Sequence, residues 1–209
     1  SLPGIEIDET WIVSSTGALA LPKVPKKLIV IGAGYIGLEL GTVWARLGAE
    51  VEVIEFLPRI LPGMDDEIAK KFTAMAKKQG LRFRLKTAVK SAKTIKTGVS
   101  LTVEPAGGGD AETIEADVAL VAVGRHPATD GLGLEGAGIA LTERGRIKVD
   151  ARFETSVEDV YAIGDVTGPP WLAHKASHEG IICVEKLAGE PDVHAIGEGA
   201  VPGCTYCRP

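Results

Sequence analysis

A glycine-rich turn between two apolar strands constrains this 209-residue chain more than any other feature. Residues 28–31 have the continuous hydrophobicity of a strand that is buried on both faces, and this run stops at Gly32. Gly32, Gly34 and Gly37 follow the pattern Gly-x-Gly-x-x-Gly. In that pattern the first glycine permits a turn, the second admits a pyrophosphate close to the backbone, and the third lets the next helix lie on the sheet. The sequence therefore predicts a dinucleotide-binding strand–turn–helix–strand unit.

The acidic residue at the end of the second strand indicates which dinucleotide is bound. Glu55 follows Gly37 by 18 residues, where a carboxylate accepts hydrogen bonds from both ribose hydroxyls and repels a 2′-phosphate. The helix N-terminus supplies N–H groups and partial positive charge for the phosphates. We therefore predict NAD rather than NADP, with Arg59 as the nearby cation that opposes this reading. The alternative is that the glycine-rich turn only packs a helix tightly against the sheet. This alternative explains less, because the strand, the glycine spacing and the terminal acid all agree with a dinucleotide site.

Bulk properties exclude several classes of function. The net charge is −5 and basic clusters are lacking, which argues against nucleic-acid binding. No apolar run approaches the length of a membrane span, and we find no secretory leader pattern. We expect a cytoplasmic protein or one of the mitochondrial matrix. The length suits one large or two smaller domains.

The three cysteines leave two readings open. Cys204 and Cys207 form a Cys-x-x-Cys pair, but a zinc site needs two more ligands and no second pair exists, so no metal site is predicted. Cys183 lies alone in an apolar helical stripe. The pair is read either as two reduced thiols or as a redox switch in a non-enzymatic NAD-binding module.

Local patterns place the other elements of an α/β fold. Residues 1–25 read as a connecting segment. Asp65 is a candidate N-cap for a helix with a solvated lysine face that Gly80 ends. From Leu81 the apolar residues alternate, which predicts an antiparallel insertion with its hairpin tip at residues 107–110.

The second half of the chain predicts a second polar site. An apolar strand at residues 118–123 runs into Gly124, and shorter strands are expected at residues 147–149 and 160–163. Asp165 follows the last of these, shortly before a helix at about 171–187. An acid at a strand end beside a helix N-terminus is typical of a ligand site, although Asp165 could simply cap a turn.

Five segments together resemble one known family. They are residues 31–41, 60–65, 123–127, 160–166 and 172–176. The set resembles the flavoprotein disulfide reductases (class I pyridine nucleotide-disulfide oxidoreductases), and within them the dihydrolipoyl dehydrogenase branch. The resemblance implies a Rossmann-like FAD/NAD(P)-binding fold, a parallel sheet with a crossover antiparallel β insertion, plus part of a second FAD-binding domain.

The resemblance also implies a domain order. Residues 1–22 would be the tail of a first FAD-domain segment, 23–148 the NAD-binding domain, 149–199 the returning FAD segment and 200–209 the start of a dimerisation domain. The chain starts at Ser1 without an initiator methionine, and we expect an internal fragment of a homodimeric enzyme.

Residue roles follow from the resemblance by position. The NAD site would comprise Gly32, Ala33, Gly34, Tyr35, Ile36, Gly37, Leu38, Glu39, Glu55, Val89 and Gly124. Glu39 would lie beside the nicotinamide, and Tyr35 would cover the flavin or be only a half-buried aromatic. The FAD site would use Asp165, Trp171, Leu172, Ala173 and His174. Trp171 stands where the family has methionine, and His174 is expected to pack or cap rather than catalyse.

The implied activity is FAD-dependent oxidation of protein-bound dihydrolipoamide, with hydride passing to NAD. The implied partners are lipoyl domains of 2-oxoacid dehydrogenase or glycine cleavage complexes. The family's Cys-x4-Cys pair and C-terminal His and Glu are not among the 209 residues, so no catalytic residue is assigned and the chain alone is expected to be inactive. An NADH peroxidase, or a mercuric or glutathione reductase, remains an alternative.

Overall fold

The chain forms two compact units in the computed structural model, which describes residues 2–197 and 199–208. One unit comprises Ser1–Gly124 with Cys204–Pro209, and the other Arg125–Gly203. The domain boundaries expected after residues 22, 148 and 199 stay predictions. Ser1, Glu198 and Pro209 belong to the expected segments 1–22, 149–199 and 200–209 but lie outside the described residues.

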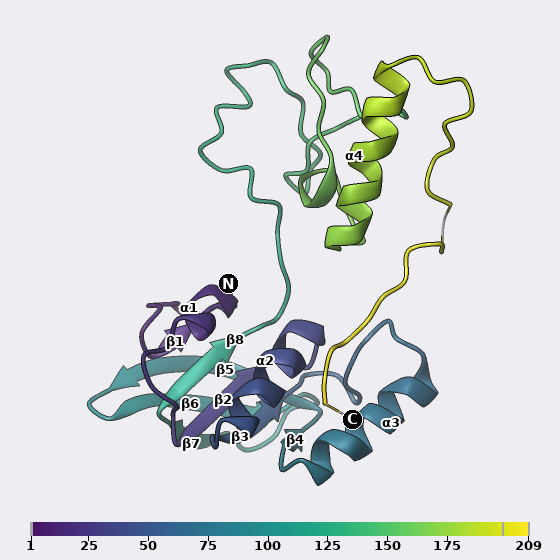
Figure 1. Cartoon of the computed structure of the whole chain (residues 1–209). Coiled ribbons are helices and arrows are strands. Elements are labelled where there is room, and N and C mark those ends of the chain that lie inside the picture. The colour runs from purple at the N-terminus through teal and green to yellow at the C-terminus, as the bar shows by residue number, and fades with distance from the viewer. Residues whose placement is uncertain (1, 198, 209) are drawn as a thin grey trace. The chain divides into compact units, whose positions relative to one another are not determined.

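A five-stranded parallel sheet is the centre of the first unit (Figure 1). Its strands lie in the order β1 (Ile12–Val13), β8 (Val118–Val121), β2 (Lys27–Ile31), β3 (Glu50–Ile54) and β4 (Arg82–Arg84). All four neighbouring pairs are parallel. Because parallel strands end at one edge, β2, β3 and β8 deliver their following loops to the same side of the sheet.

Alternate residues of β2 pack into two different layers. Leu28 and Val30 join a core cluster with α1 (Ser15–Leu19), α2 (Tyr35–Arg46) and α3 (Asp66–Lys78). Ile29 and Ile31 join a second cluster on the opposite face of the sheet. Successive side chains of a strand point to opposite faces, so a strand covered on both sides must be apolar throughout. The predicted α/β class is confirmed.

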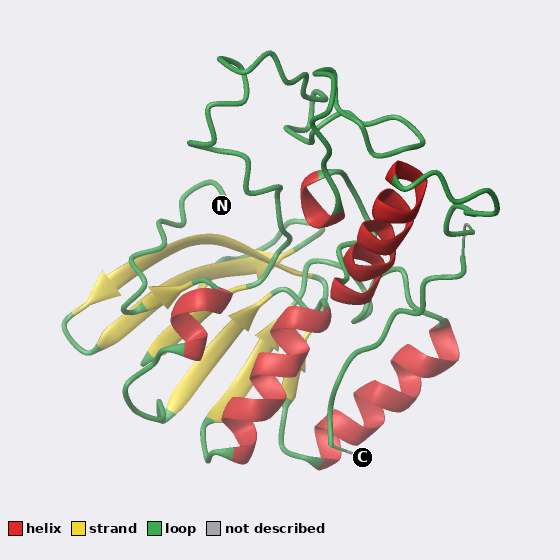
Figure 2. Ribbon diagram, turned by 45° about the horizontal axis from the view of Figure 1, so that its top comes forward, coloured by secondary structure: helices red, strands yellow, loops and turns green. Residues whose placement is uncertain are grey.

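The second layer is an antiparallel sheet of β5 (Thr87–Ile95), β6 (Gly98–Pro105) and β7 (Glu112–Ala116) (Figure 2). It confirms the predicted insertion, with residues 107–110 in the connection between β6 and β7. The alternation suggested that residues 81–85 belong to this antiparallel sheet, but they do not. They contain β4, which pairs in parallel with β3 and is held there by an ion pair between Arg84 and Glu52.

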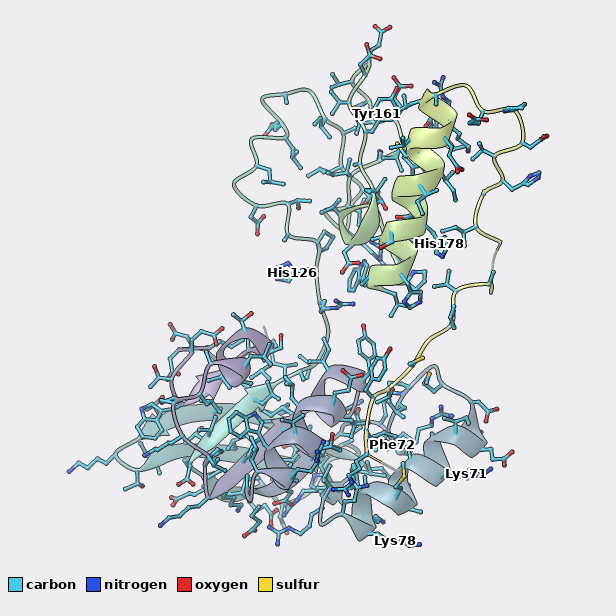
Figure 3. The ribbon with its side chains drawn as sticks, in the orientation of Figure 1. Lys71, Phe72, Lys78, His126, Tyr161 and His178 are labelled. Atoms are coloured by element: carbon cyan, nitrogen blue, oxygen red, sulfur yellow. The ribbon has the colours of Figure 1, made fainter. Side chains whose placement is uncertain are left out.

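The helix α3 matches its predicted limits. The Asp65 carboxylate accepts hydrogen bonds from the N–H groups of Glu67 and Ile68, which caps the first turn. Gly80, at φ +95°, follows the helix C-terminus. Phe72 is buried against the sheet, whereas Lys71 and Lys78 lie on the exposed face (Figure 3).

The N-terminal residues contribute more than a connection. Ile12 and Val13 form β1 and pair with Ala119 and Leu120 of β8. The strand β8 itself ends at Val121, two residues earlier than expected.

The second unit is built around one helix, α4 (Ala173–Leu187), and a short 3₁₀ turn, η1 (Gly164–Val166). The strands expected at residues 147–149 and 160–163 are wrong, since only isolated bridges join Leu141 to Ile147 and Glu154 to Tyr161. A strand needs a neighbour along its whole length, and the described residues of this unit supply single bridges. No helix in the described part of the chain is long and apolar enough to cross a membrane.

We expect the central sheet to tolerate truncation poorly. Leu120 is fully buried between the layers, so Leu120→Ala should lower the free energy of unfolding by about 2–5 kcal/mol. Leu19→Ala is the control, because Leu19 is 75% exposed and its truncation should change stability by about 0.5 kcal/mol or less. Urea unfolding followed by circular dichroism would measure both, and equal losses would contradict the assigned core.

Candidate functional site

The glycine turn after β2 is formed by close backbone contacts. Gly32 has φ +102°, and a Cβ there would lie 2.5 Å from the carbonyl oxygen of Ala122. A Cβ at Gly37 would lie 2.2 Å from the Gly32 oxygen. These two glycines are therefore required by the packing of the turn, β8 and α2 themselves.

Gly34 differs because the protein leaves the space beside it open. A Cβ at Gly34 would meet no atom within 4 Å, and its φ of −76° suits any residue. Gly34 is the N-cap of α2, where no side chain caps the helix. Open space beside uncapped N–H groups is what a bound phosphate needs, so the turn fits a dinucleotide.

Glu55 is held in place by the backbone on both sides of it. Its Oε2 accepts a hydrogen bond of 2.7 Å from the Ala33 N–H, and its Oε1 one of 2.9 Å from the Leu57 N–H. The residue is only 8% exposed. Each carboxylate oxygen has lone pairs for more than one donor, so a ribose hydroxyl can still bind. Glu55 therefore fits the ribose role and also fixes the turn.

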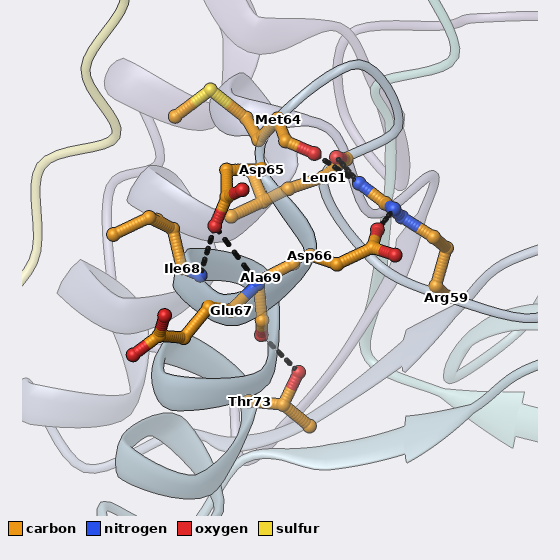
Figure 4. A network of polar contacts seen from close by, with 9 residues as sticks. All are labelled: Arg59, Leu61, Met64, Asp65, Asp66, Glu67, Ile68, Ala69 and Thr73. Carbon is orange, nitrogen blue, oxygen red and sulfur yellow. Dashed lines mark hydrogen bonds and ion pairs between the residues drawn. The ribbon is translucent and has the colours of Figure 1, made fainter.

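Arg59, the cation that opposed the NAD reading, is engaged within its own loop. Its guanidinium donates to the carbonyl oxygens of Leu61 and Met64 and pairs with Asp66 (Figure 4). Leu61 in turn donates its N–H to the Ala33 oxygen at 2.8 Å. The loop is thus fastened to the glycine turn, and the Arg59 guanidinium is engaged with acceptors of its own loop.

Glu39 has a partner that the sequence did not suggest. Its Oε1 accepts a hydrogen bond of 2.9 Å from the backbone N–H of Tyr206. Cys207, the next residue, packs against the helix-side core cluster. Residues near the C-terminus therefore dock on α2, in the same unit as the glycine turn.

The other expected NAD-site residues fall into two groups. Ala33 and Leu38 are fully buried in the core, and Val89 packs against the second core cluster. Tyr35 and Gly124 are exposed, and Ile36 is half-buried. Their roles toward a cofactor stay predictions.

In the second unit, Arg125 brings Asp165 and Trp171 together. The Arg125 guanidinium lies 3.3 Å from Asp165 Oδ2 and 5.4 Å from the centroid of the Trp171 ring. Arg146 lies on the same ring at 5.9 Å. Arg125 lies within one of the segments that resemble the family, but the sequence suggests no role for it, because its partners are 40 and 46 residues away.

The start of α4 offers donors without acceptors. The Trp171 indole N–H is buried and finds no acceptor among the described residues. Leu172 is the N-cap and provides no side-chain cap to the helix that begins at Ala173. His174 is exposed, with Nε2 2.9 Å from the Pro202 oxygen. Orphaned donors at a helix N-terminus fit a polar ligand such as the flavin ring.

The cysteines are free thiols. Cys183 is buried in α4, Cys204 is exposed and Cys207 is half-buried. Burial raises the pKa of the Cys207 thiol above its ordinary value. Among the described residues no group of three or more His, Cys, Asp or Glu could hold a metal ion.

Known protein sequences match this chain along its whole length. A family model described as pyridine nucleotide-disulphide oxidoreductase matches residues 1–180. The mitochondrial dihydrolipoyl dehydrogenase of Pisum sativum is 56% identical over 209 residues, which is 100% of this chain and 41% of that protein. Dihydrolipoyl dehydrogenase 3 of Pseudomonas putida is 51% identical over 208 residues, 100% of this chain and 44% of that protein. The chain thus spans about two fifths of these curated relatives.

A solved structure of similar fold has been determined for a bacterial reductase. The Cu(II) complex of the HOCl-induced flavoprotein disulfide reductase RclA from Escherichia coli matches with a TM-score of 0.82 and 32% identity. The match covers 92% of this chain and 44% of that one.

We expect Gly34→Ala and Gly37→Ala to fail in different ways. Gly34→Ala should change the free energy of unfolding by about 1 kcal/mol or less, since its methyl group meets open space, but should weaken NADH binding. Gly37→Ala should destabilise the fold by about 1–3 kcal/mol through the contact with Gly32. Urea unfolding and NADH calorimetry separate the two. Unchanged NADH affinity in Gly34→Ala would contradict the phosphate site.

We expect Cys207 to react more slowly than Cys204. Its raised pKa leaves less thiolate, and burial limits access, so iodoacetamide at about pH 8 should alkylate Cys204 first. Mass spectrometry of timed samples gives both rates, with the urea-unfolded chain as control. Thiol titration with and without oxidant also tests the switch reading, which requires an intramolecular disulfide between the two.

Proposed function

Because the chain belongs to the pyridine nucleotide-disulphide oxidoreductase family, we propose that it provides the NAD site and part of the FAD site of a dihydrolipoyl dehydrogenase. Bound FAD would supply two-electron transfer between a dithiol and NAD. The substrate would be protein-bound dihydrolipoamide. The dithiol-reacting cysteine pair and the acid/base residues would come from outside these 209 residues.

The observation that carries the NAD half is the link between Glu55 and the glycine turn. The Ala33 N–H donates to Glu55, so the group that would grip the ribose is fixed against the turn that would bind the phosphates. A preformed site of this kind spends little binding energy on ordering itself. Arg59 is engaged with Leu61, Met64 and Asp66, so a 2′-phosphate would have to compete with these partners for its guanidinium.

The FAD half is supported by the start of α4 and by Asp165. The Asp165 carboxylate is 49% exposed and can accept hydrogen bonds from ribityl hydroxyls. The N–H groups at the start of α4 would stabilise negative charge on a reduced flavin ring. The unpaired Trp171 indole N–H adds a further donor.

The names of the relatives favour the lipoamide branch. Sequences over 50% identical to the whole chain are named dihydrolipoyl dehydrogenase in both a plant and a bacterium. A relative from Glycine max at 54% identity is named leghemoglobin reductase, so another NADH-dependent reductase is the second candidate. We further propose lipoyl domains of 2-oxoacid dehydrogenase or glycine cleavage complexes as partners, a homodimer, and a location in the bacterial cytoplasm or the mitochondrial matrix.

We expect Glu55→Ala to weaken NADH binding about 10-fold or more, because charge-assisted hydrogen bonds to the ribose are lost. NADPH binding should stay weak, since Arg59 remains engaged. Fluorescence titration with both nucleotides measures this. Glu50→Ala, at the other end of β3, is the matched control and should bind NADH as before.

A second variant guards against misfolding. Glu55→Gln keeps one acceptor oxygen for the backbone donors and should give an intermediate NADH affinity. An unaltered NADH affinity in folded Glu55→Ala would disprove the ribose role. NADPH bound as tightly as NADH by the unchanged protein would disprove the NAD preference.

A further inference from the structure

The helix α4 carries two charged side chains on its buried face. Lys175 Nζ lies 2.8 Å from Glu179 Oε1, and each side chain is 9% exposed. A buried ion pair usually adds little stability, because both charges lose their hydration. Stability alone is therefore a weak explanation of this pair, and its other contacts are more informative.

Both side chains also bind the backbone of the same turn. Glu179 Oε2 accepts a hydrogen bond of 2.7 Å from the Gly164 N–H. Lys175 Nζ donates to the Gly168 carbonyl oxygen at 3.0 Å. Gly164 and Gly168 are the two ends of the turn that contains Asp165. The ion pair thus joins both ends of this turn to α4.

The turn has other anchors as well, among them the ion pair between Asp165 and Arg125. Thr167 donates from its hydroxyl to the Gly164 oxygen at 2.8 Å, which closes the turn internally. The Ile147 N–H donates to the Val166 oxygen at 2.9 Å. Gly164 lies so close to α4 that a Cβ there would be 3.1 Å from the Cβ of Ala176. The helix α4 therefore supplies three of the contacts that set the path of the backbone around Asp165.

We propose that Lys175 and Glu179 are positioning residues, which hold the turn from Gly164 to Gly168 so that Asp165 meets the ribityl chain of FAD. This inference rests on the proposed function of Asp165. The pair does not touch the cofactor. It acts through the backbone groups of Gly164 and Gly168, whose hydrogen bonds to charged partners are stronger than neutral ones.

A double-mutant cycle on the intact flavin-loaded protein tests this. Lys175→Met removes the ammonium and keeps the length of the stem. FAD affinity is measured from the flavin fluorescence that dissociation restores. We expect Lys175→Met to weaken FAD binding about 10-fold when Asp165 is present. In an Asp165→Asn background the same substitution should weaken FAD binding about 2-fold or less. Effects that are not additive in this way are expected of residues that act as one unit.

The chain contains a matched control. Glu67 and Lys71 of α3 form an i,i+4 ion pair of 2.7 Å that is largely exposed. Lys71→Met removes the same charge from the same kind of pair and should leave FAD affinity unchanged. NADH affinity of the FAD-saturated protein should be unchanged in all variants, because none of them alters the glycine turn or Glu55.

The outcomes distinguish the positioning role of Lys175 and Glu179 from the FAD-binding role of Asp165. If Asp165→Asn weakens FAD binding but its effect adds to that of Lys175→Met, the positioning role is overturned and the role of Asp165 stands. If Asp165→Asn has no effect on FAD affinity, both are overturned. Should Lys175→Met not fold, Glu179→Gln replaces it in the cycle, because the amide oxygen still accepts from the Gly164 N–H.

Discussion

The hydrogen bonds of the Glu55 carboxylate join two loops at the carboxyl edge of the parallel sheet in the first unit. One oxygen binds the N–H of Ala33 in the glycine turn, and the other binds the N–H of Leu57 in the loop after β3. Net contributions of about 1.5–3 kcal/mol are typical for hydrogen bonds to charged groups. A single side chain therefore ties together two loops that follow neighbouring strands. As a result, the N-terminus of α2 keeps a fixed position relative to the Glu55 carboxylate.

The second unit holds a turn by the same kind of contact. A turn that would present Asp165 to a cofactor must be held by its backbone, and Lys175 and Glu179 bind that backbone from α4. In both units the fixing groups are charged side chains that bind main-chain N–H or C=O. Gly34 is nevertheless bordered by open space, and the Asp165 carboxylate, which pairs with Arg125, is still 49% exposed.

Local signals in the sequence were sufficient for the glycine turn, for α3 with its cap, and for the antiparallel insertion. Each depends on periodicity or on residues a few positions apart. The strands expected at 147–149 and 160–163 were wrong, because a strand exists only where a distant partner pairs with it. The same limit hid the engagement of Arg59, which depends on a loop where Leu61 has φ +50°, and the contact between Glu39 and Tyr206, 167 residues apart. The i,i+4 spacing of the opposite charges of Lys175 and Glu179 was a signal that could have suggested their ion pair.

The hydrogen bond from the Tyr206 N–H to Glu39 has a thermodynamic consequence. A molecule that needs the same carboxylate oxygen competes with residues 204–208 for it or shares it with them. Binding of such a molecule to Glu39 and docking of residues 204–208 on α2 are then linked equilibria. Each event must change the equilibrium constant of the other by the same factor.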